Sequence, residues 1–305
     1  MVIGESQGMG PAWTPGQLGI AVTLGGLDWV ETPNSTAIDL RNDVTVELSF
    51  RVDRFANTWM PLLYKGTGFG ARTYSMWLNS NGSLHLSTWD NASNEYISTA
   101  AGSIKAGEWY HVAGVLDRTN GQMRIVLDGA DAASGSLRSA PSSAAGGALL
   151  LGKTPESSGD YAQFEGAIDD VRIWNVARPT TAIAAGRRAE LAGTEAGLTF
   201  YLSLDENAGL TATDRVSGLA TSQLRSLVEG AEGVIAGRVG QPGQMVHYTF
   251  ALAEARRLYF DTLSDSNLQW SCPARTERSF PTVRCVTRTA PMPRHSSIWA
   301  RASTR

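Results

Sequence analysis

The stretch VTVELSFRV, residues 44–52, alternates apolar and polar side chains from end to end. Successive side chains of a β-strand point to opposite faces, so this stretch presents one apolar and one polar face. The apolar face carries Val44, Val46, Leu48, Phe50 and Val52, and the polar face carries Thr45, Glu47, Ser49 and Arg51. The alternation predicts a half-buried strand.

Short runs of strand-forming residues follow along the chain. They span residues 60–65, 74–78, 83–89, 109–116, 123–128, 148–151, 167–174 and 198–204. Turn signals separate several of them, at Asn81-Gly82, Asn120-Gly121 and Asp128-Gly129. Helix signals are sparse, and one short helix is predicted after Pro179. This pattern predicts an all-β, two-sheet antiparallel sandwich and argues against a parallel sheet with crossover helices.

Composition agrees with a globular β protein. Of 305 residues, 42% are hydrophobic and 18% are charged, and 32 glycines and 12 prolines supply turns. These values exclude a disordered chain and a long helical bundle. No eighteen apolar residues run together, and the start MVIGESQGMG lacks the basic and apolar parts of a signal peptide. We therefore expect no membrane span and no export signal in this sequence.

Charge divides the chain unevenly. Residues 271–305 carry seven arginines and one acid, a net charge of +6; since the whole chain carries −3, residues 1–270 carry −9. An acidic body disfavours nucleic acid as a partner, because phosphate contacts need a basic face. Both cysteines, Cys272 and Cys285, lie in the basic part, so the body has no disulfide framework.

Seven segments of the sequence carry a resemblance to a known protein family. They are LGGLDWVETPNS (24–35), DVTVELSFRVD (43–53), GEWYHVAGVLD (107–117), MRIVLDG (123–129), ALLLG (148–152), GAIDDVRIWNVARP (166–179) and LAGTEAGLTFYLSLDENAG (191–209). In this order they resemble the laminin-G-like, concanavalin A-type jelly-roll modules of bacterial surface proteins, which are related to pentraxins. The resemblance implies two antiparallel sheets packed face to face, with ligand sites in rim loops or on the concave sheet.

The resemblance and the charge boundary together predict the domain organisation. We expect a flexible N-terminus at residues 1–17, the jelly-roll domain at 18–215 and a linker at 216–232. Residues 233–271 resemble the opening strands of a bacterial pre-peptidase-type β-sandwich and are expected to be a partial second β segment. Residues 272–305 are expected to form a basic, irregular tail.

No catalytic string stands out. The GESQG at residues 4–8 matches a nucleophile elbow by letter but lacks the preceding strand, and GTGFG at 66–70 is a turn. Glucanases with this sandwich use two carboxylates about 5 Å apart on one strand face. The nearest candidates, Glu47 and the pair Asp169-Asp170, do not give that spacing. Histidines are scattered without metal-ligand spacing and receive no chemical role.

The resemblance implies calcium as the cofactor. In related modules an acidic residue near the first strand meets an acidic residue near the last strand at the rim of the sandwich. Matched by motif, these are Asp28 and Asp169, with the carbonyls of Gly25 and Gly26 nearby. The alternative is that Asp28 caps a turn and Asp169 accepts hydrogen bonds from loop amides. The loop at residues 89–95 offers further oxygens, but a solvated hairpin tip is the favoured interpretation.

Aromatic residues suggest a second kind of site, because aromatic rings pack against the apolar faces of sugars. Trp109 and Trp174 lie within strand motifs and are expected to be buried. The candidate ligand-binding residues lie at strand ends or in loops: Trp59, Trp89, Tyr96 and Tyr161.

These features lead to a non-catalytic recognition module of a larger secreted or surface-attached bacterial protein. Its expected ligand is a glycan or an extracellular protein, with calcium as the candidate cofactor, and its expected place is extracellular or at the cell surface. A structural spacer or adhesion repeat without its own ligand is the alternative, and a glycoside hydrolase ranks third. Since sandwich folds host many activities, this function follows from the resemblance rather than from the fold.

Overall fold

The computed structural model describes residues 11–90, 93–138, 146–156, 158–226, 246–251, 268–271, 274–277 and 280–289. The chain forms two compact units, one of residues 8–234 and the other of residues 1–7 and 235–305. In the described parts of both, the regular secondary structure is almost entirely β-strand.

The larger unit has one short helix, α1 (Thr180–Gly186), and the strands β1 to β16. The strands are β1 (Ala12–Pro15), β2 (Ile20–Gly25), β3 (Asp28–Thr32), β4 (Val44–Val52), β5 (Trp59–Gly66), β6 (Arg72–Asn79), β7 (Leu84–Asp90), β8 (Ser93–Ser98), β9 (Trp109–Asp117), β10 (Gln122–Leu127), β11 (Ala130–Ser136), β12 (Leu149–Leu151), β13 (Glu165–Trp174), β14 (Leu198–Leu202), β15 (Thr211–Asp214) and β16 (Leu219–Ser226).

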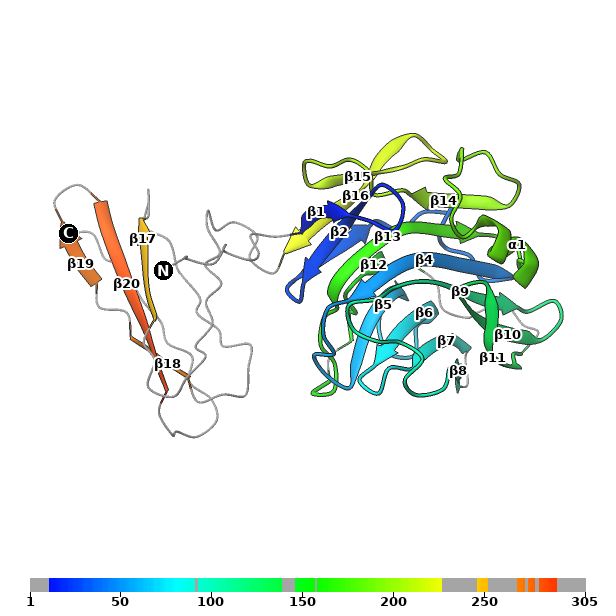
Figure 1. The fold of residues 1–305 in the computed structure, drawn as a ribbon, viewed down its shortest axis with the longest axis horizontal. Helices are drawn as coiled ribbons and strands as arrows, with labels where there is room; N and C mark the ends of the chain where they lie inside the picture. The colour runs from blue at the N-terminus through cyan, green and yellow to red at the C-terminus, as the bar shows by residue number, and fades with distance from the viewer. Residues whose placement is uncertain are drawn as a thin grey trace. The chain divides into compact units, whose positions relative to one another are not determined.

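These strands form one hydrogen-bonded path that folds into two layers. The path runs β11-β10-β9-β4-β13-β14-β15-β16-β3-β12-β5-β6-β7-β8, with β2 also paired to β13 and β1 to β2. One layer contains β11, β10, β9, β4 and β13, and the other contains β3, β12, β5, β6, β7 and β8; β14, β15 and β16 connect them (Figure 1). Neighbouring strands pair antiparallel. The predicted two-sheet antiparallel sandwich is confirmed.

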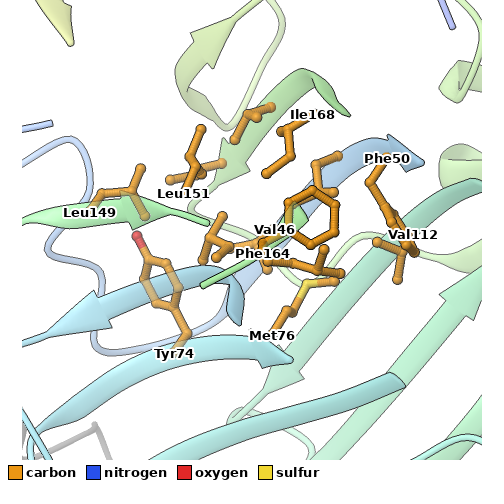
Figure 2. Close-up of a cluster of buried hydrophobic side chains, with 14 of the residues drawn as sticks. Val46, Phe50, Tyr74, Met76, Val112, Leu149, Leu151, Phe164 and Ile168 are labelled. Carbon is orange, nitrogen blue, oxygen red and sulfur yellow. The ribbon is translucent and has the colours of Figure 1, made fainter. Parts of the chain in front are cut away.

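The hydrophobic core lies between the two layers. One layer contributes the apolar face of β4 with parts of β9 and β13, and the other contributes residues of β5, β6, β7 and β12. Figure 2 shows side chains from both layers meeting: Val46, Phe50, Val112 and Ile168 from the first, and Tyr74, Met76, Leu149 and Leu151 from the second. Burial of apolar surface on this scale is the main stabilising contribution to a sandwich.

The prediction that β4 is only half buried is wrong. Thr45, Glu47 and Ser49 on its polar face are fully buried. The chain leading into α1 lies on this face: the Thr45 hydroxyl donates to the Val176 carbonyl at 2.7 Å, and the guanidinium of Arg178 donates to Glu47. Sequence alternation shows which residues are polar, but a later segment determines whether water reaches them.

The sandwich strands extend beyond the range expected for the domain. β1 begins before residue 18, and β16 ends at Ser226, inside the segment expected to be a linker. β16 pairs with β3 and buries Leu224. These strands, like β11, carry few apolar residues, and their backbone hydrogen bonds place them in the sheet, which is why alternation does not reveal them.

The smaller unit has a four-stranded sheet in its described residues. Its strands are β17 (Val246–Ala251), β18 (Leu268–Ser271), β19 (Ala274–Glu277) and β20 (Phe280–Thr289), and β20 pairs antiparallel with the other three. β19 and β20 fall within residues 272–305, for which we expect an irregular tail. The threonines and valines of residues 280–289 favour strand geometry without regular alternation. The pre-peptidase resemblance stays a prediction.

Gly166 permits the close approach of β13 to β4. Its φ is +153°, and a Cβ added there would lie 2.0 Å from the carbonyl oxygen of Arg51 on β4. We expect Gly166→Ala to lower the free energy of unfolding by more than about 1 kcal/mol, because the substitution adds both backbone strain and a clash with main chain. Urea denaturation of the full chain measures the change.

Gly159→Ala is the matched control, because no atom lies within 4 Å of a Cβ at that position. Its effect should stay within about 0.5 kcal/mol. Equal urea midpoints for the two variants would contradict the role given to Gly166.

Candidate functional site

The side of β7 that faces away from the core carries rings and small polar groups. Leu84 and Leu86 point into the core, so the alternate positions, His85, Ser87 and Trp89, lie on the opposite face. This alternation selects the outer surface of the layer as the place to search for a site.

The strand register extends this outer surface sideways. Across the β6–β7 pair, Trp77 lies opposite His85 and Ser75 opposite Ser87, and across the β7–β8 pair Tyr96 lies opposite Ser87. The hydroxyls of Ser75 and Ser87 are 2.8 Å apart and fully buried. Small residues therefore occupy the middle of this surface, with large rings around them.

Ring contacts join the aromatic side chains into small groups, and a backbone bridge links two of these groups. The ring of His85 lies 5.0 Å from that of Trp59 and 4.9 Å from that of Tyr96, centroid to centroid. Trp59 forms a β-bridge with Tyr161, whose ring is 5.2 Å from Trp77. These distances are in the range of favourable aromatic pairs.

Two further rings form a separate pair at residues 66–70 and the end of β7. Phe69 packs against Trp89 with centroids 5.0 Å apart. Phe69 and Tyr96 are 71% and 60% exposed, so large apolar rings face solvent. We call this surface the aromatic face, made of Trp59, Tyr64, Phe69, Trp77, His85, Trp89, Tyr96 and Tyr161.

An ion pair lies among these rings. The Nε and Nη2 atoms of Arg72 donate to the two carboxylate oxygens of Glu156, each at 2.6 Å. The hydroxyls of Tyr64 and Tyr161 donate to the same carboxylate at 2.7 and 3.2 Å. The side chains of Arg72 and Glu156 are only 6% and 3% exposed. Glu156 therefore accepts four hydrogen bonds from three side chains in one nearly buried network.

Burial and this ion pair set the charges of the aromatic face. Burial alone would raise the pKa of Glu156, but hydrogen bonds from Arg72 and Tyr64 outweigh it and hold the pKa below its usual value. Burial, with a smaller contribution from the nearby Arg72 charge, lowers the pKa of His85 to about 4. At neutral pH Glu156 is therefore a carboxylate and His85 is uncharged.

The structure brings together the four aromatic residues predicted to bind ligand. Trp59, Trp89, Tyr96 and Tyr161 all belong to the aromatic face, although they come from three strands and a loop. Trp174 is buried as expected, whereas Trp109 is only partly buried. Ligand binding by the four residues stays a prediction.

Sequence reasoning missed the other members of this surface. Alternation within residues 83–89 was sufficient to place His85 on the same side as Trp89, but the histidine receives no role from sequence alone. Phe69 lies in a segment interpreted only as a turn. Arg72 and Glu156 carry no sequence signal, because 84 positions separate them and their pairing depends on the fold.

The predicted calcium ligands do not gather at one point. The carboxylate of Asp28 accepts from the Gly25 amide at 3.0 Å, and Gly25 lies opposite Glu165 on β13. Asp169 lies four residues further along β13, roughly 13 Å away at the usual strand rise, and accepts from the Leu18 amide at 2.9 Å. One ion therefore cannot bind both side chains.

Other groups surround these candidates. The Gly26 position lies against Glu165, a carboxylate that pairs with Arg54. Burial, together with the charges of Asp170 and Asp205, raises the pKa of Asp169 to about 7, although the Leu18 amide acts in the opposite direction. A pocket of about 160 Å³ lies nearby, lined by Leu18, Gly19, Asp170, Glu190, Tyr201, Ser203 and Asp205. Across the described ranges, no three histidine, cysteine or acidic residues gather to hold a metal.

The strand order and the motif around β13 agree with a known family. The family model of the concanavalin A-like lectin/glucanases superfamily matches residues 24–184. The chain belongs to this superfamily. The match covers β3 to β13 and most of α1, and so includes the whole aromatic face. No curated protein matches the sequence.

Solved structures are similar to this superfamily member in fold. A Bacteroides ovatus protein provisionally described as carbohydrate-binding has 16% identity and a TM-score of 0.51, over 72% of this chain and 60% of that one. Domain 4 of an extracellular arabinanase from Geobacillus stearothermophilus, in complex with arabinotriose, has 19% identity and a TM-score of 0.48, over 59% and 82%. The CBM40 of the Ruminococcus gnavus IT-sialidase, bound to α2,3-sialyllactose, has 13% identity and a TM-score of 0.46, over 55% and 96%. At these identities the likeness concerns the fold alone.

In the part of the chain that the structure describes, no helix has the length and apolar character to cross a bilayer.

The lowered pKa of His85 makes stability depend on pH. Its folded pKa is about 4 and its ordinary value is 6.5, so the unfolded chain takes up a proton first as pH falls. The stabilising contribution is complete above pH 6.5 and is lost as pH falls towards 4. We expect about 2 kcal/mol of loss between pH 7.5 and pH 5.

His85→Phe keeps a ring beside Trp59 and Tyr96 but cannot titrate. Wild type should therefore lose about 2 kcal/mol more unfolding free energy than this variant between pH 7.5 and pH 5. Urea midpoints measured at half-unit intervals of pH test this, and a difference that stays constant with pH would contradict it.

Proposed function

We propose that the aromatic face binds carbohydrate, as the recognition surface of a non-catalytic module. The observation that supports this most directly is the gathering of three groups of packed rings on one outer face of the sandwich, with Phe69 and Tyr96 more than half exposed. Exposed apolar patches on a folded domain mark interaction sites. Ring faces suit sugars because a pyranose also has an apolar face.

The rings are held in place before a ligand arrives. Trp77 donates from its Nε1 to Ser75 at 2.9 Å, and Tyr161 is fixed by its bridge to Trp59 and its hydrogen bond to Glu156. A preorganised surface loses little conformational entropy on binding. Membership of a superfamily that includes lectins supports the same proposal.

The module binds sugar without cleaving it in this proposal. Retaining and inverting glycosidases need one carboxyl group to protonate the leaving oxygen and a second to act as nucleophile or base. Both oxygens of Glu156 on the aromatic face already accept hydrogen bonds from Arg72 and a tyrosine. Release of reducing sugar from any polysaccharide that the protein retains would contradict this part.

A glycan-binding module of this kind is proposed to act outside the cell, within a larger secreted or surface-attached protein. Glycan polymers are extracellular ligands, which is the reason for this placement. A spacer without a ligand, or a module that binds protein, remains the competing function, and the retention experiment below distinguishes them.

Calcium binding is proposed separately from the sugar site. The Oδ1 atom of Asp169 is buried and has no hydrogen-bond partner, which leaves an oxygen for a cation.

We expect the thermal midpoint of unfolding to rise by several degrees in calcium relative to chelator, and Asp169→Asn to abolish the rise. Asp28→Asn is the control variant. Because Asp28 lies too far from Asp169 to bind the same ion, this variant should keep the rise of the midpoint in calcium. An unchanged wild-type midpoint would exclude calcium at the concentrations used.

Replacing rings of the aromatic face should weaken retention on polysaccharide. We expect Trp59→Ala and Trp89→Ala each to reduce affinity by about tenfold, because each removes a stacking surface of the order of 1.4 kcal/mol. Affinity electrophoresis against a panel of soluble polysaccharides measures the change.

Trp109→Ala is the matched control, since Trp109 lies on β9 in the other layer, beneath the guanidinium of Arg51. It should leave retention unchanged. No retention of wild type by any polysaccharide would favour the spacer, and equal loss in all three variants would show that the aromatic face has no special role.

A further inference from the structure

The Arg72–Glu156 pair places opposite charges at the middle of the aromatic face. The guanidinium lies between two rings, 5.4 Å from the centroid of Phe69 and 5.5 Å from that of Trp77. An arginine flanked by rings and free to donate two parallel hydrogen bonds is a strong binder of carboxylates. Here those two donors already contact a carboxylate of the same chain.

An acidic sugar would have to compete with Glu156 for Arg72. Breaking the pair would leave Glu156 as a nearly buried charge without its cation, and such charges are costly. Leaving the pair intact would place the sugar carboxylate beside another negative group. Both routes disfavour an anionic ligand, while a neutral sugar meets no such penalty.

Other charged side chains near this layer do not make the aromatic face more favourable to an anionic sugar. His85 is neutral at physiological pH, so it brings no cation to the rings. Lys153 lies with its Nζ 3.3 Å from the centroid of Trp29, and the Nε1 of the same indole donates to Glu31 at 3.0 Å, so a carboxylate and a cation contact the same ring. Glu95 on β8 pairs with Arg138 at 4.0 Å.

We propose that Glu156 determines the ligand class of the aromatic face: by occupying Arg72, it restricts the face to uncharged sugars and excludes acidic ones. This inference rests on the proposed carbohydrate binding and adds a residue that sets its specificity. Glu156 acts through Arg72 and need not contact the sugar.

The test compares polymers that differ in charge alone. Polygalacturonate and its carboxyl-reduced form share one backbone, and a neutral β-glucan and an arabinan widen the neutral set. We expect wild type to bind at least one neutral polymer and to bind polygalacturonate at least about tenfold more weakly than the neutral polymers it retains. In Glu156→Gln, Arg72 loses its carboxylate partner, and affinity for polygalacturonate should rise by about tenfold, with the gain lost in high salt.

Two further variants keep the result interpretable. Glu95→Gln removes a carboxylate from the same layer without touching Arg72 and should leave the ratio of acidic to neutral binding as in wild type. The double variant Arg72→Met with Glu156→Gln removes both charges, so it avoids a buried unpaired cation and should show no gain for polygalacturonate. Near-ultraviolet circular dichroism confirms that each variant is folded.

The outcomes separate the two proposals. If wild type binds none of the polymers, the proposed carbohydrate binding is wrong and the inference falls with it. If wild type binds neutral and acidic polymers equally, or a folded Glu156→Gln shows no gain, carbohydrate binding stands and the role of Glu156 is wrong. If Glu156→Gln fails to fold, a double variant that gains affinity for polygalacturonate overturns the inference, and one that keeps the wild-type preference supports it.

Discussion

The structure depends on the burial of two apolar sheet faces against each other. β4 and β13 run side by side in one layer (Figure 1), and their inward residues pack in one core with inward residues of β5, β6 and β12. Because strand side chains alternate, filling the core with one set directs the other set outward. Gly166 is part of the same constraint, since only a residue without Cβ allows β13 to approach the Arg51 carbonyl. The aromatic face is an outward face created by this packing.

The two outward faces differ in what covers them. Over the layer of β4, β9 and β13, α1 contributes Ile183 to a small cluster with Ala113, Val115 and Val126. Beneath the chain leading into α1, Glu47 pairs with Arg178, and Arg172 pairs with Asp170. These pairings offset the cost of removing the charges from water. Over β5 to β8, by contrast, large rings reach solvent. The first face is thus covered by other parts of the domain, whereas the second keeps two exposed rings, Phe69 and Tyr96, beside a buried cluster that includes Tyr64 and Trp77.

The aromatic face also shows how structure converts separate residues into one surface. Tyr96 and Trp59 are 37 positions apart, yet both contact His85. Glu156 reaches Arg72 from a loop 84 positions away, and two tyrosine hydroxyls complete the network. A nearly buried carboxylate is stable there because four donors share it, and its effect on neighbouring charges is a property of the whole arrangement.

Sequence by itself determined the all-β sandwich, most of its core strands, and four of the eight ring-bearing residues of the aromatic face: Trp59, Trp89, Tyr96 and Tyr161. It did so because strand alternation, turn signals and the positions of aromatic residues relative to the predicted strands are visible in short stretches of sequence. Tertiary structure alone decided that Glu47 is buried, that Asp28 on β3 and Asp169 on β13 lie apart, and that Glu156 occupies Arg72. These depend on which distant segments pack together, and loop residues such as Glu156 have no periodic pattern that reveals their partner. The chain leading into α1 covers Glu47, the register of β2 on β13 separates Asp28 from Asp169, and the loop that carries Glu156 reaches Arg72, so each result requires contacts between segments that are distant in the sequence.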